Sequence, residues 1–289
     1  MHVHGFADLW EHARLLSDRP RNDALIALLR RRAPDARVLE IGCGTGVLSC
    51  VAARLGARHV HAVEPTAQIE VARQLVDANG LSDRITLHEA AIEDLPPEPV
   101  DLVFSELLNA DPFVEGLLEA SDAGARWLAP TGHLAPQRLR LHLAATSSDR
   151  SAQEVSQARR ALVELATAHD LRLDPLLEGL DTLEPYAYIA PTVEAVAPSV
   201  PALDLALGQG EVPPERIELR LPTEGLEAVH GVVVWFEAVL DEGLSMANPP
   251  GRPGHWGHLV LGLPRLVPSG QPLALHLSID EGELTVGLS

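Results

Sequence analysis

The segment Val38–Gly46 constrains the fold of this chain more than any other part of the sequence. It reads Val-Leu-Glu-Ile-Gly-Cys-Gly-Thr-Gly, a short apolar strand that runs into alternating glycines. The apolar stretch Val47–Leu55 follows and predicts a helix. Glycine allows a sharp turn and close approach of a ligand, and the helix N-terminus adds unpaired amides and a positive dipole end. We therefore expect a nucleotide-like cofactor at the switch point of an α/β sheet.

The first half of the chain alternates between strand and helix patterns. Residues 7–32 predict two short helices that break near Pro20, with Asp18 capping the second. After them we expect strands at Arg37–Ile41, His59–Glu64, Ile85–Glu89 and Val100–Ser105, and helices at Val47–Leu55, Ala67–Asn79 and Pro112–Leu128. This rhythm is typical of a parallel sheet with helices on both faces.

The second half is dominated by short apolar runs that Pro and Gly separate. We expect Leu139–Ala145 to be extended, Gln153–His169 to be helical and Leu173–Ala190 to be irregular. Six strands are then expected, at Ala202–Leu207, Arg216–Leu221, Val232–Leu240, His258–Leu263, Leu273–Ile279 and Leu284–Leu288. The pattern favours an antiparallel, barrel-like second domain.

These patterns divide the chain into three predicted units. Residues 1–36 form N-terminal helices that cover the cofactor, and residues 37–145 form a Rossmann-like cofactor domain. Residues 146–289 form a β-barrel substrate domain with a helical insertion at 150–190. The overall fold class is α/β, with a mostly parallel sheet followed by an antiparallel barrel-like domain.

Composition excludes several classes of protein. The 289 residues are 46% hydrophobic, which indicates a globular chain, and the net charge is −19 with no lysine. Phosphate binding needs a basic face, so we expect no nucleic-acid partner; an acidic surface would instead attract a basic substrate. No apolar run approaches the roughly 20 residues of a membrane span, and the first residues do not resemble a signal peptide.

The cysteines and histidines predict neither a disulfide framework nor a metal site. Cys43 and Cys50 lie in an apolar setting that suggests buried thiols, so we expect a cytoplasmic protein. The remaining histidines, among them His59, His61, His88 and His258, lack a shared spacing, and we expect no metal site.

An acidic residue completes the predicted cofactor site. Glu64 ends the second strand about 20 residues beyond the glycine turn, where a nucleoside-binding fold places an acid on the ribose hydroxyls. The turn is Gly-x-Gly-x-Gly and fits a dinucleotide pyrophosphate less well than Gly-x-Gly-x-x-Gly would. Without Gly-Lys-Ser/Thr it is not a P-loop.

Two glutamates follow the fourth strand. Glu106 and Glu115 lie nine positions apart, one at the strand tip and one past a loop. Strand tips at the carboxyl edge of an open α/β sheet line the active crevice. A carboxylate pair there suits a guanidinium, whose fork of donors matches carboxylate oxygens.

The glycine turn and the acid after the second strand resemble the cofactor site of class I S-adenosylmethionine-dependent methyltransferases. Val38–Gly46 matches the first motif of that family, and Glu64 matches its ribose-binding acid. The resemblance implies that S-adenosyl-L-methionine is the cofactor and S-adenosyl-L-homocysteine the product. It implies that the main chain of Ile92 flanks the adenine ring and that Glu93 accepts a hydrogen bond from the amino group of the adenine. The implied cofactor residues are Gly42, Cys43, Gly44, Thr45, Gly46, Glu64, Pro65, Ile92 and Glu93.

Three further segments narrow the resemblance to the protein arginine methyltransferases. The loop from Glu106 to Gly116 resembles their double-Glu loop, in the branch that carries Glu-Gly at the second acid. His12 and Arg21 match N-terminal residues that approach the methionine carboxylate of the cofactor. Gly254-His255-Trp256 resembles the Thr-His-Trp loop, whose His pairs with an acid, here Asp18. The resemblance extends over nearly the whole chain.

The resemblance implies roles for these residues. Glu106, Glu115, His255 and Asp18 would be catalytic; Glu106, Glu115 and Trp256 would contact the substrate; and His12, Arg21 and Glu106 would contact the cofactor. The Asp18–His255 pair is either a proton relay or a clasp between the N-terminal helix and the barrel.

The sequence also departs from the family. Its usual N-terminal aromatics are absent, the common Met-Gly-Tyr is replaced by Leu107-Leu108-Asn109, and Gly254 replaces Thr. The segment after Leu139, where a dimerisation arm would lie, diverges most and leaves a homodimer open.

Three functional hypotheses follow. The first is methylation of a guanidino group, on arginine in a protein or peptide or on free arginine. The second is a small-molecule methyltransferase of secondary metabolism that acts on an indole or amine. The third is a non-catalytic regulator that binds S-adenosylmethionine.

Overall fold

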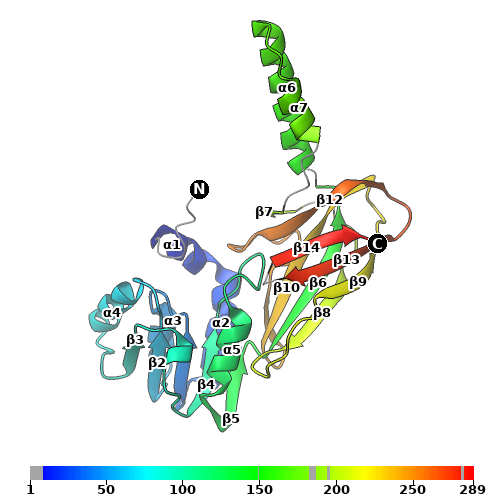
Figure 1. The fold of residues 1–289 in the computed structure, drawn as a ribbon. Coiled ribbons are helices and arrows are strands. Elements are labelled where there is room, and N and C mark those ends of the chain that lie inside the picture. The colour runs from blue at the N-terminus through cyan, green and yellow to red at the C-terminus, as the bar shows by residue number, and fades with distance from the viewer. Residues whose placement is uncertain (1–8, 149, 182–186, 194–195, 281–282) are drawn as a thin grey trace.

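The computed structural model describes residues 9–148, 150–181, 187–193, 196–280 and 283–289. Residues 1–8, the start of the predicted N-terminal unit, lie outside this range. Two helices open the described chain, α1 (Leu9–Ser17) and α2 (Arg19–Arg32) (Figure 1). Asp18 separates them and caps α2, since its carboxylate accepts the Arg21 amide at 3.1 Å. Pro20 lies in the first turn of α2, where its missing N–H costs nothing.

A five-stranded sheet follows in the order β3-β2-β1-β4-β5, and all four pairings are parallel. Its strands are β1 (Arg37–Ile41), β2 (His59–Val63), β3 (Ile85–His88), β4 (Val100–Ser105) and β5 (Leu128–Ala135). The connecting helices are α3 (Val47–Arg54), α4 (Ile69–Ala78), the 3-10 turn η1 (Ile92–Asp94) and α5 (Leu117–Ala125). The predicted parallel α/β fold is confirmed.

The predicted helix Pro112–Leu128 is wrong at both ends. Residues 112–116 belong to a loop, and α5 begins only after Gly116, whose φ of +72° is left-handed. Its last predicted residues lead instead into β5, which contains Pro130 and Gly132. These residues are tolerated because β5 lies at the edge of the parallel sheet, where Pro need not donate to a further strand.

Two antiparallel sheets form the second half, as predicted. The larger has the order β7-β12-β10-β6-β8, with β11 paired to β10, and the smaller has the order β14-β13-β9. Their strands are β6 (Arg138–Thr146), β7 (Tyr188–Ala190), β8 (Val200–Ala206), β9 (Arg216–Leu221), β10 (Ala228–Asp241), β11 (Leu244–Ala247), β12 (His258–Pro268), β13 (Leu273–Asp280) and β14 (Glu283–Leu288). Pairing changes from parallel to antiparallel between β5 and β6. The strand β6 therefore belongs to the second sheet, although nearly all of it precedes the domain boundary expected at residue 145.

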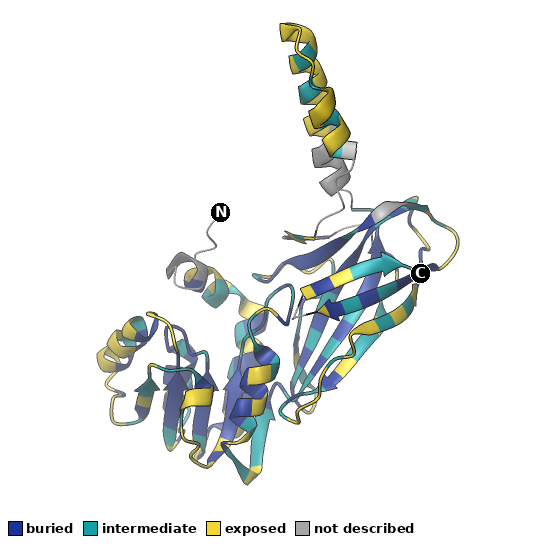
Figure 2. Ribbon diagram, viewed as in Figure 1, coloured by how far each residue is buried: buried dark blue, intermediate teal, exposed yellow. Residues whose placement is uncertain are grey.

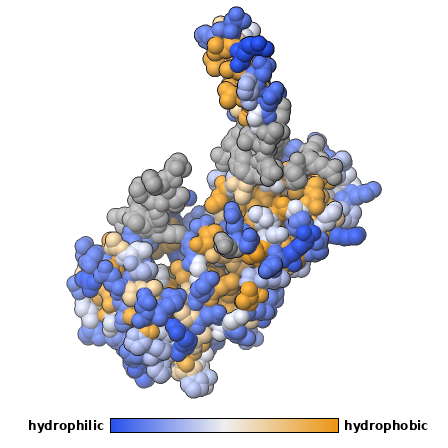
Figure 3. Space-filling view, in the orientation of Figure 1, coloured by the Kyte–Doolittle hydropathy of each residue, from blue (hydrophilic) through white to orange (hydrophobic). Residues whose placement is uncertain are grey.

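A helical hairpin projects from the barrel between β6 and β7 (Figure 1). It consists of α6 (Arg150–His169) and α7 (Asp174–Asp181). The expectation that Leu173–Ala190 is irregular is therefore wrong for α7 and β7, while residues 182–186 lie outside the described range. Apolar side chains of the hairpin are exposed, including Val163, Leu165, Leu171 and Leu176 (Figure 3).

The core runs continuously from the parallel sheet into the barrel (Figure 2). Leu25 and Leu28 of α2 pack in the same apolar cluster as Phe104 of β4 and Val232 of β10. A separate cluster, which includes Trp127, fills the opposite face of the sheet under α5. Because α2 is buried between the two domains, it holds the cofactor edge of the sheet against the barrel. Among the described residues no helix is long and apolar enough to cross a membrane.

Candidate active site

A cavity of about 290 Å³ lies at the carboxyl edge of the parallel sheet. Its wall comes from α1, α2, the loops after β1 and β2, and the loop after β4. Nine predicted site residues line it together with Glu115: His12, Arg21, Gly42, Cys43, Gly44, Thr45, Glu64, Pro65 and Glu106. Residues far apart in sequence thus meet where the sheet topology predicts a ligand.

The glycine turn forms the floor of this cavity. Gly44 has a φ of +52°, and a Cβ there would lie 2.5 Å from Cε1 of His12. The turn amides are used inside the protein: Gly42 and Cys43 donate to the Val63 carbonyl, and Gly44 donates to Glu64 Oε2 at 2.9 Å. A turn with its amides occupied in this way is poorly suited to phosphates, which need free N–H groups.

Glu64 is fixed by two backbone amides. Besides Gly44, the amide of Thr66 donates to Glu64 Oε1 at 3.0 Å, and the side chain is buried. It lines the cavity, and its role as a ribose-binding acid stays a prediction.

Glu40 is a site residue that the sequence analysis missed. It lies in β1, is only 4% exposed and accepts a hydrogen bond from Ser49 Oγ of α3. Burial raises the pKa of its carboxyl to about 8, and the bond from Ser49 offsets part of that rise. An acid inside an otherwise apolar strand was the signal that could have identified it.

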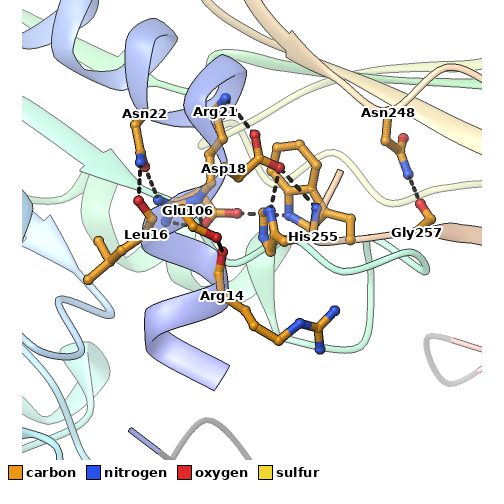
Figure 4. A network of polar contacts seen from close by, with 11 residues as sticks. Arg14, Leu16, Asp18, Arg21, Asn22, Glu106, Asn248, His255 and Gly257 are labelled. Carbon is orange, nitrogen blue, oxygen red and sulfur yellow. Dashed lines mark hydrogen bonds and ion pairs between the residues drawn. The ribbon is translucent and has the colours of Figure 1, made fainter. Parts of the chain in front are cut away.

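Arg21 and Glu106 form a buried ion pair at the centre of the site (Figure 4). Arg21 donates from Nε and Nη2 to Glu106 Oε2, and from Nη1 to Asn22 at 2.9 Å. Trp256 donates its indole N–H to the other carboxylate oxygen at 3.1 Å. Both oxygens of Glu106 are therefore held, one by α2 and the other by the loop before β12.

Glu115 is held differently. Asn109 Nδ2 donates to its Oε1 at 2.9 Å, and Asn109 Oδ1 in turn accepts the Ala110 amide at 2.7 Å. Burial raises the pKa of Glu115 to about 7; the Asn109 bond and the charge of Arg21 lower it, while the charge of Glu106 raises it. In the sequence Asn109 is only part of a departure from the family pattern and carries no predicted role.

The predicted pairing of Asp18 with His255 is present (Figure 4). Asp18 Oδ2 accepts from both the Nδ1 and the backbone amide of His255, each at 2.9 Å. Burial lowers the pKa of His255; the pKa of Asp18 is also lowered, because hydrogen bonds from His255 and Arg21 outweigh its own burial. A neutral imidazole must therefore donate from Nδ1, which leaves Nε2 as the acceptor.

Some predicted residues do not line the main cavity. His255 and Trp256 line an adjoining cavity of about 250 Å³ with Leu108 and Asn109, and Asp18 lies in neighbouring hollows. Gly46 caps α3 behind the turn. Ile92 is buried in η1 and Glu93 is exposed, so the adenine contacts expected of them stay predictions. No three metal-ligating side chains cluster among the described residues.

The cavity has a distinctive charge. Four carboxylic acids line it, from Glu40, Glu64, Glu106 and Glu115, against a single arginine, Arg21. Arg21 neutralises Glu106, and Glu40 is mostly protonated at neutral pH because its pKa is about 8, so the wall keeps a smaller excess of acid. That excess disfavours a pyrophosphate and suits ligands that carry a positive charge. The arginine fork supplies one place for a carboxylate, because its five N–H donors exceed the bonds it makes to Glu106 and Asn22.

Comparisons with known proteins agree with this geometry. A model described as "Methyltransferase domain" matches residues 38–132. The chain is 31% identical over 293 residues to the arginine N(omega)-methyltransferase of Streptomyces achromogenes subsp. streptozoticus, covering 96% of this chain and 78% of that protein. It is 28% identical to a probable histone-arginine methyltransferase CARM1 of Oryza sativa, of which it spans 56%.

Solved structures share the fold. Protein arginine methyltransferase 10 of Arabidopsis thaliana superposes with a TM-score of 0.80 at 23% identity, covering 94% of this chain and 88% of that one. The PRMT1 enzyme-prozyme heterotetrameric complex of Trypanosoma brucei with AdoHcy gives 0.78 at 22% identity, covering 97% and 90%. At these identities the likeness concerns the arrangement of the two domains.

Proposed function

The chain belongs to the arginine methyltransferase family, and from that premise we propose that it methylates a guanidino nitrogen of arginine with S-adenosyl-L-methionine as donor. The acceptor is arginine in a protein or peptide, or free arginine. The observation that carries this proposal is that Glu106 and Glu115 meet Arg21 and the glycine turn in one cavity. When bound, the cofactor would supply an electrophilic methyl carbon on a sulfonium, with the neutral thioether S-adenosylhomocysteine as the leaving group.

The residues present fit this cofactor. The acidic wall suits a sulfonium cation, Arg21 has N–H groups for the methionine carboxylate, and Glu64 has the place of a ribose-binding acid. His12 closes the cavity over Gly44. Phosphate-bearing cofactors are disfavoured by the same carboxylates and by the occupied turn amides.

The two glutamates would activate the acceptor. A guanidinium is a poor nucleophile because its charge is delocalised, and carboxylates that bind two of its nitrogens leave the third more electron-rich. Alignment by the pair also removes much of the entropic part of the barrier. Glu115 would be ionised when it holds the cation, and it is the group placed to take the proton that the methylated nitrogen releases.

In this proposal the Asp18–His255 pair is a clasp. Neither residue lines the main cavity, whereas the contact joins the cap of α2 to the loop before β12. Held there, α1 and α2 cover the cofactor side of the cavity. Trp256 extends the same loop to Glu106 and orients that carboxylate toward the acceptor.

The proposal also includes a homodimer and a cytoplasmic location. Exposed apolar side chains on α6 and α7 support the first, since single-chain surfaces seldom leave such a hairpin uncovered. Cys43 and Cys50 are buried free thiols, which supports a reducing compartment.

Mass spectrometry of products tests the function. The protein would receive labelled S-adenosylmethionine with free L-arginine, an arginine-rich peptide, or indole. We expect methylated arginine from one of the first two and no product from indole, because a neutral indole gains nothing from two carboxylates. Titration calorimetry should give micromolar or tighter binding of S-adenosylhomocysteine. Binding without any guanidino product would remove the proposal and leave the regulatory hypothesis.

A further inference from the structure

The two glutamates of the site are held in unequal ways. Arg21 and Trp256 bind the two oxygens of Glu106, and both donors come from outside the loop that follows β4. The carboxylate of Glu115 is bound within that loop, by Asn109. A residue that the sequence places between the two acids therefore touches only one of them.

The orientation of the Asn109 amide is fixed by its neighbours. Its Oδ1 accepts the backbone N–H of Ala110 at 2.7 Å, a contact that an amide nitrogen could not make. Nδ2 is thereby left as the atom that faces Glu115 Oε1 at 2.9 Å. Ala110 is fully buried, so its amide depends on this bond and the amide flip is determined.

We propose that Asn109 is the positioning residue that holds Glu115 in its ionised form and directs its second oxygen, Oε2, to the acceptor guanidinium. This inference rests on the proposed function. Asn109 also lines the adjoining cavity with His255 and Trp256, so it stands where an acceptor would pass between the two hollows.

Electrostatics supports the role. The Nδ2 donor stabilises the carboxylate, and it opposes burial and the negative charge of Glu106, which both raise the pKa of Glu115. Arg21 also opposes them. The other titratable groups on the same cavity wall are His12, Glu40, Cys43 and Glu64. Without the donor, Glu115 would stay protonated to higher pH, and a protonated carboxyl binds a cation more weakly.

Asn109→Asp is the sharpest variant. An aspartate keeps an oxygen for the Ala110 amide, but it replaces the donor to Glu115 with a second acid, so donor loss and like charge act in the same direction. Carbon-13 NMR of labelled Glu carboxyls, assigned with Glu115→Gln, would follow the titration of Glu115 in the complex with S-adenosylhomocysteine. We expect its midpoint to rise by about one pH unit or more in Asn109→Asp. Asn109→Ala should raise it less, and the matched exposed variant Asn79→Asp should leave it unchanged.

The same variants give a kinetic readout. Because the pKa of Glu115 starts near pH 7, we expect kcat/KM for the arginine acceptor to fall about fivefold at pH 7 for the first unit of that rise and about tenfold for each further unit. It should recover at higher pH, with KM changing more than kcat. An unshifted Glu115 titration in Asn109→Asp would overturn the inference. That NMR result needs no turnover, whereas failure of the wild type to methylate any guanidino compound would overturn the proposed function alone.

Discussion

Trp256 donates its indole N–H to Glu106 Oε1 across 3.1 Å, joining a loop of the antiparallel domain to a strand tip of the parallel sheet. The two residues are 150 positions apart in the sequence. Glu106 is at the same time the partner of Arg21 from α2. One carboxylate therefore joins the N-terminal helices, the cofactor domain and the barrel, and its orientation depends on all three.

Replacing Trp256 with Phe should test this connection. Phe keeps the ring that packs against Phe236 at a centroid distance of 5.1 Å, but it cannot donate to Glu106. We expect kcat/KM to fall about tenfold, roughly 1.4 kcal/mol, the scale of a hydrogen bond to a charged group. Trp235→Phe is the matched control, since Trp235 donates to Ser199 and lines neither of the two cavities. Equal activity of both variants would show that the indole N–H is irrelevant.

Glu115→Gln should abolish turnover while S-adenosylhomocysteine still binds. The amide keeps the shape of the side chain but cannot take the charge of a guanidinium, so we expect kcat to drop by at least about a hundredfold. Glu119→Gln, on the exposed side of α5, should have no effect. Steady-state kinetics and calorimetry on the same preparations measure both quantities, and a Glu115→Gln enzyme with normal kcat would refute the role.

The activity should depend on pH through Glu115. Its pKa is raised to about 7, so the residue is neutral below that value and cannot hold a cation. We expect kcat/KM for the arginine acceptor to fall as pH drops through about 7, approaching tenfold per unit. The profile of Glu115→Gln should lack this limb, and a wild-type profile that stays flat from pH 6 to 8 would contradict the assignment.

Arg21→Lys should weaken cofactor binding even though the charge is kept. Arg21 binds Glu106 through two nitrogens of its planar guanidinium, whereas a lysine offers a single ammonium group. The lysine therefore has fewer N–H donors left for the cofactor carboxylate. We expect the Kd for S-adenosylhomocysteine to rise about 10- to 100-fold. Arg19→Lys, two residues earlier and exposed, is the control. Calorimetry with unchanged affinity in Arg21→Lys would remove Arg21 from the cofactor site.

Asp241 should stabilise the fold in a pH-dependent way. It accepts from Nε and Nη2 of Arg32 at 3.0 and 2.7 Å, tying α2 to β10, and the bond from Arg32 lowers its pKa from 3.8 to about 2. A depressed pKa means that the contribution is complete above about 3.8 and disappears as pH falls through about 2.

The variant Asp241→Asn should therefore lose about 1 kcal/mol of unfolding free energy at pH 7, a modest value because Arg32 is 43% exposed and water screens the pair. Denaturant unfolding at pH 7 and pH 2 measures the difference, which should fall to a small fraction of its pH 7 value at the lower pH. Glu98→Gln, from the exposed pair with Arg37, should cost almost nothing. A difference that persisted undiminished at pH 2 would assign the effect to packing.

The hairpin of α6 and α7 should mediate self-association. Val163 and Leu176 are 48% and 55% exposed, and aspartates at both positions would charge an apolar surface. We expect sedimentation velocity to show a dimer for the wild type and a monomer for the double variant, with circular dichroism unchanged. Val212→Asp, at an even more exposed position, should remain dimeric. A wild-type monomer would remove the homodimer from the proposal.

Local signals predicted most of the parallel half of the fold. Arg37–Ile41 and Val100–Ser105 are found with the predicted bounds, because short apolar runs between turn residues have few alternatives. The prediction failed at β5, where Pro130 and Gly132 suggest the end of a helix. Only the free edge of a sheet makes a strand there acceptable, and which strand lies at the edge is decided by topology.

By itself the sequence determined the glycine turn, the acid after the second strand, the two glutamates after the fourth, and the family that these residues resemble. Those features lie within short segments whose geometry the backbone fixes locally. The tertiary structure alone decided how the groups are paired: Glu106 with Trp256, Glu115 with Asn109, and a buried Glu40 whose pKa is about 8. The physical reason is that protonation and orientation depend on burial and on donors brought from distant parts of the chain, and neither is a property of a motif.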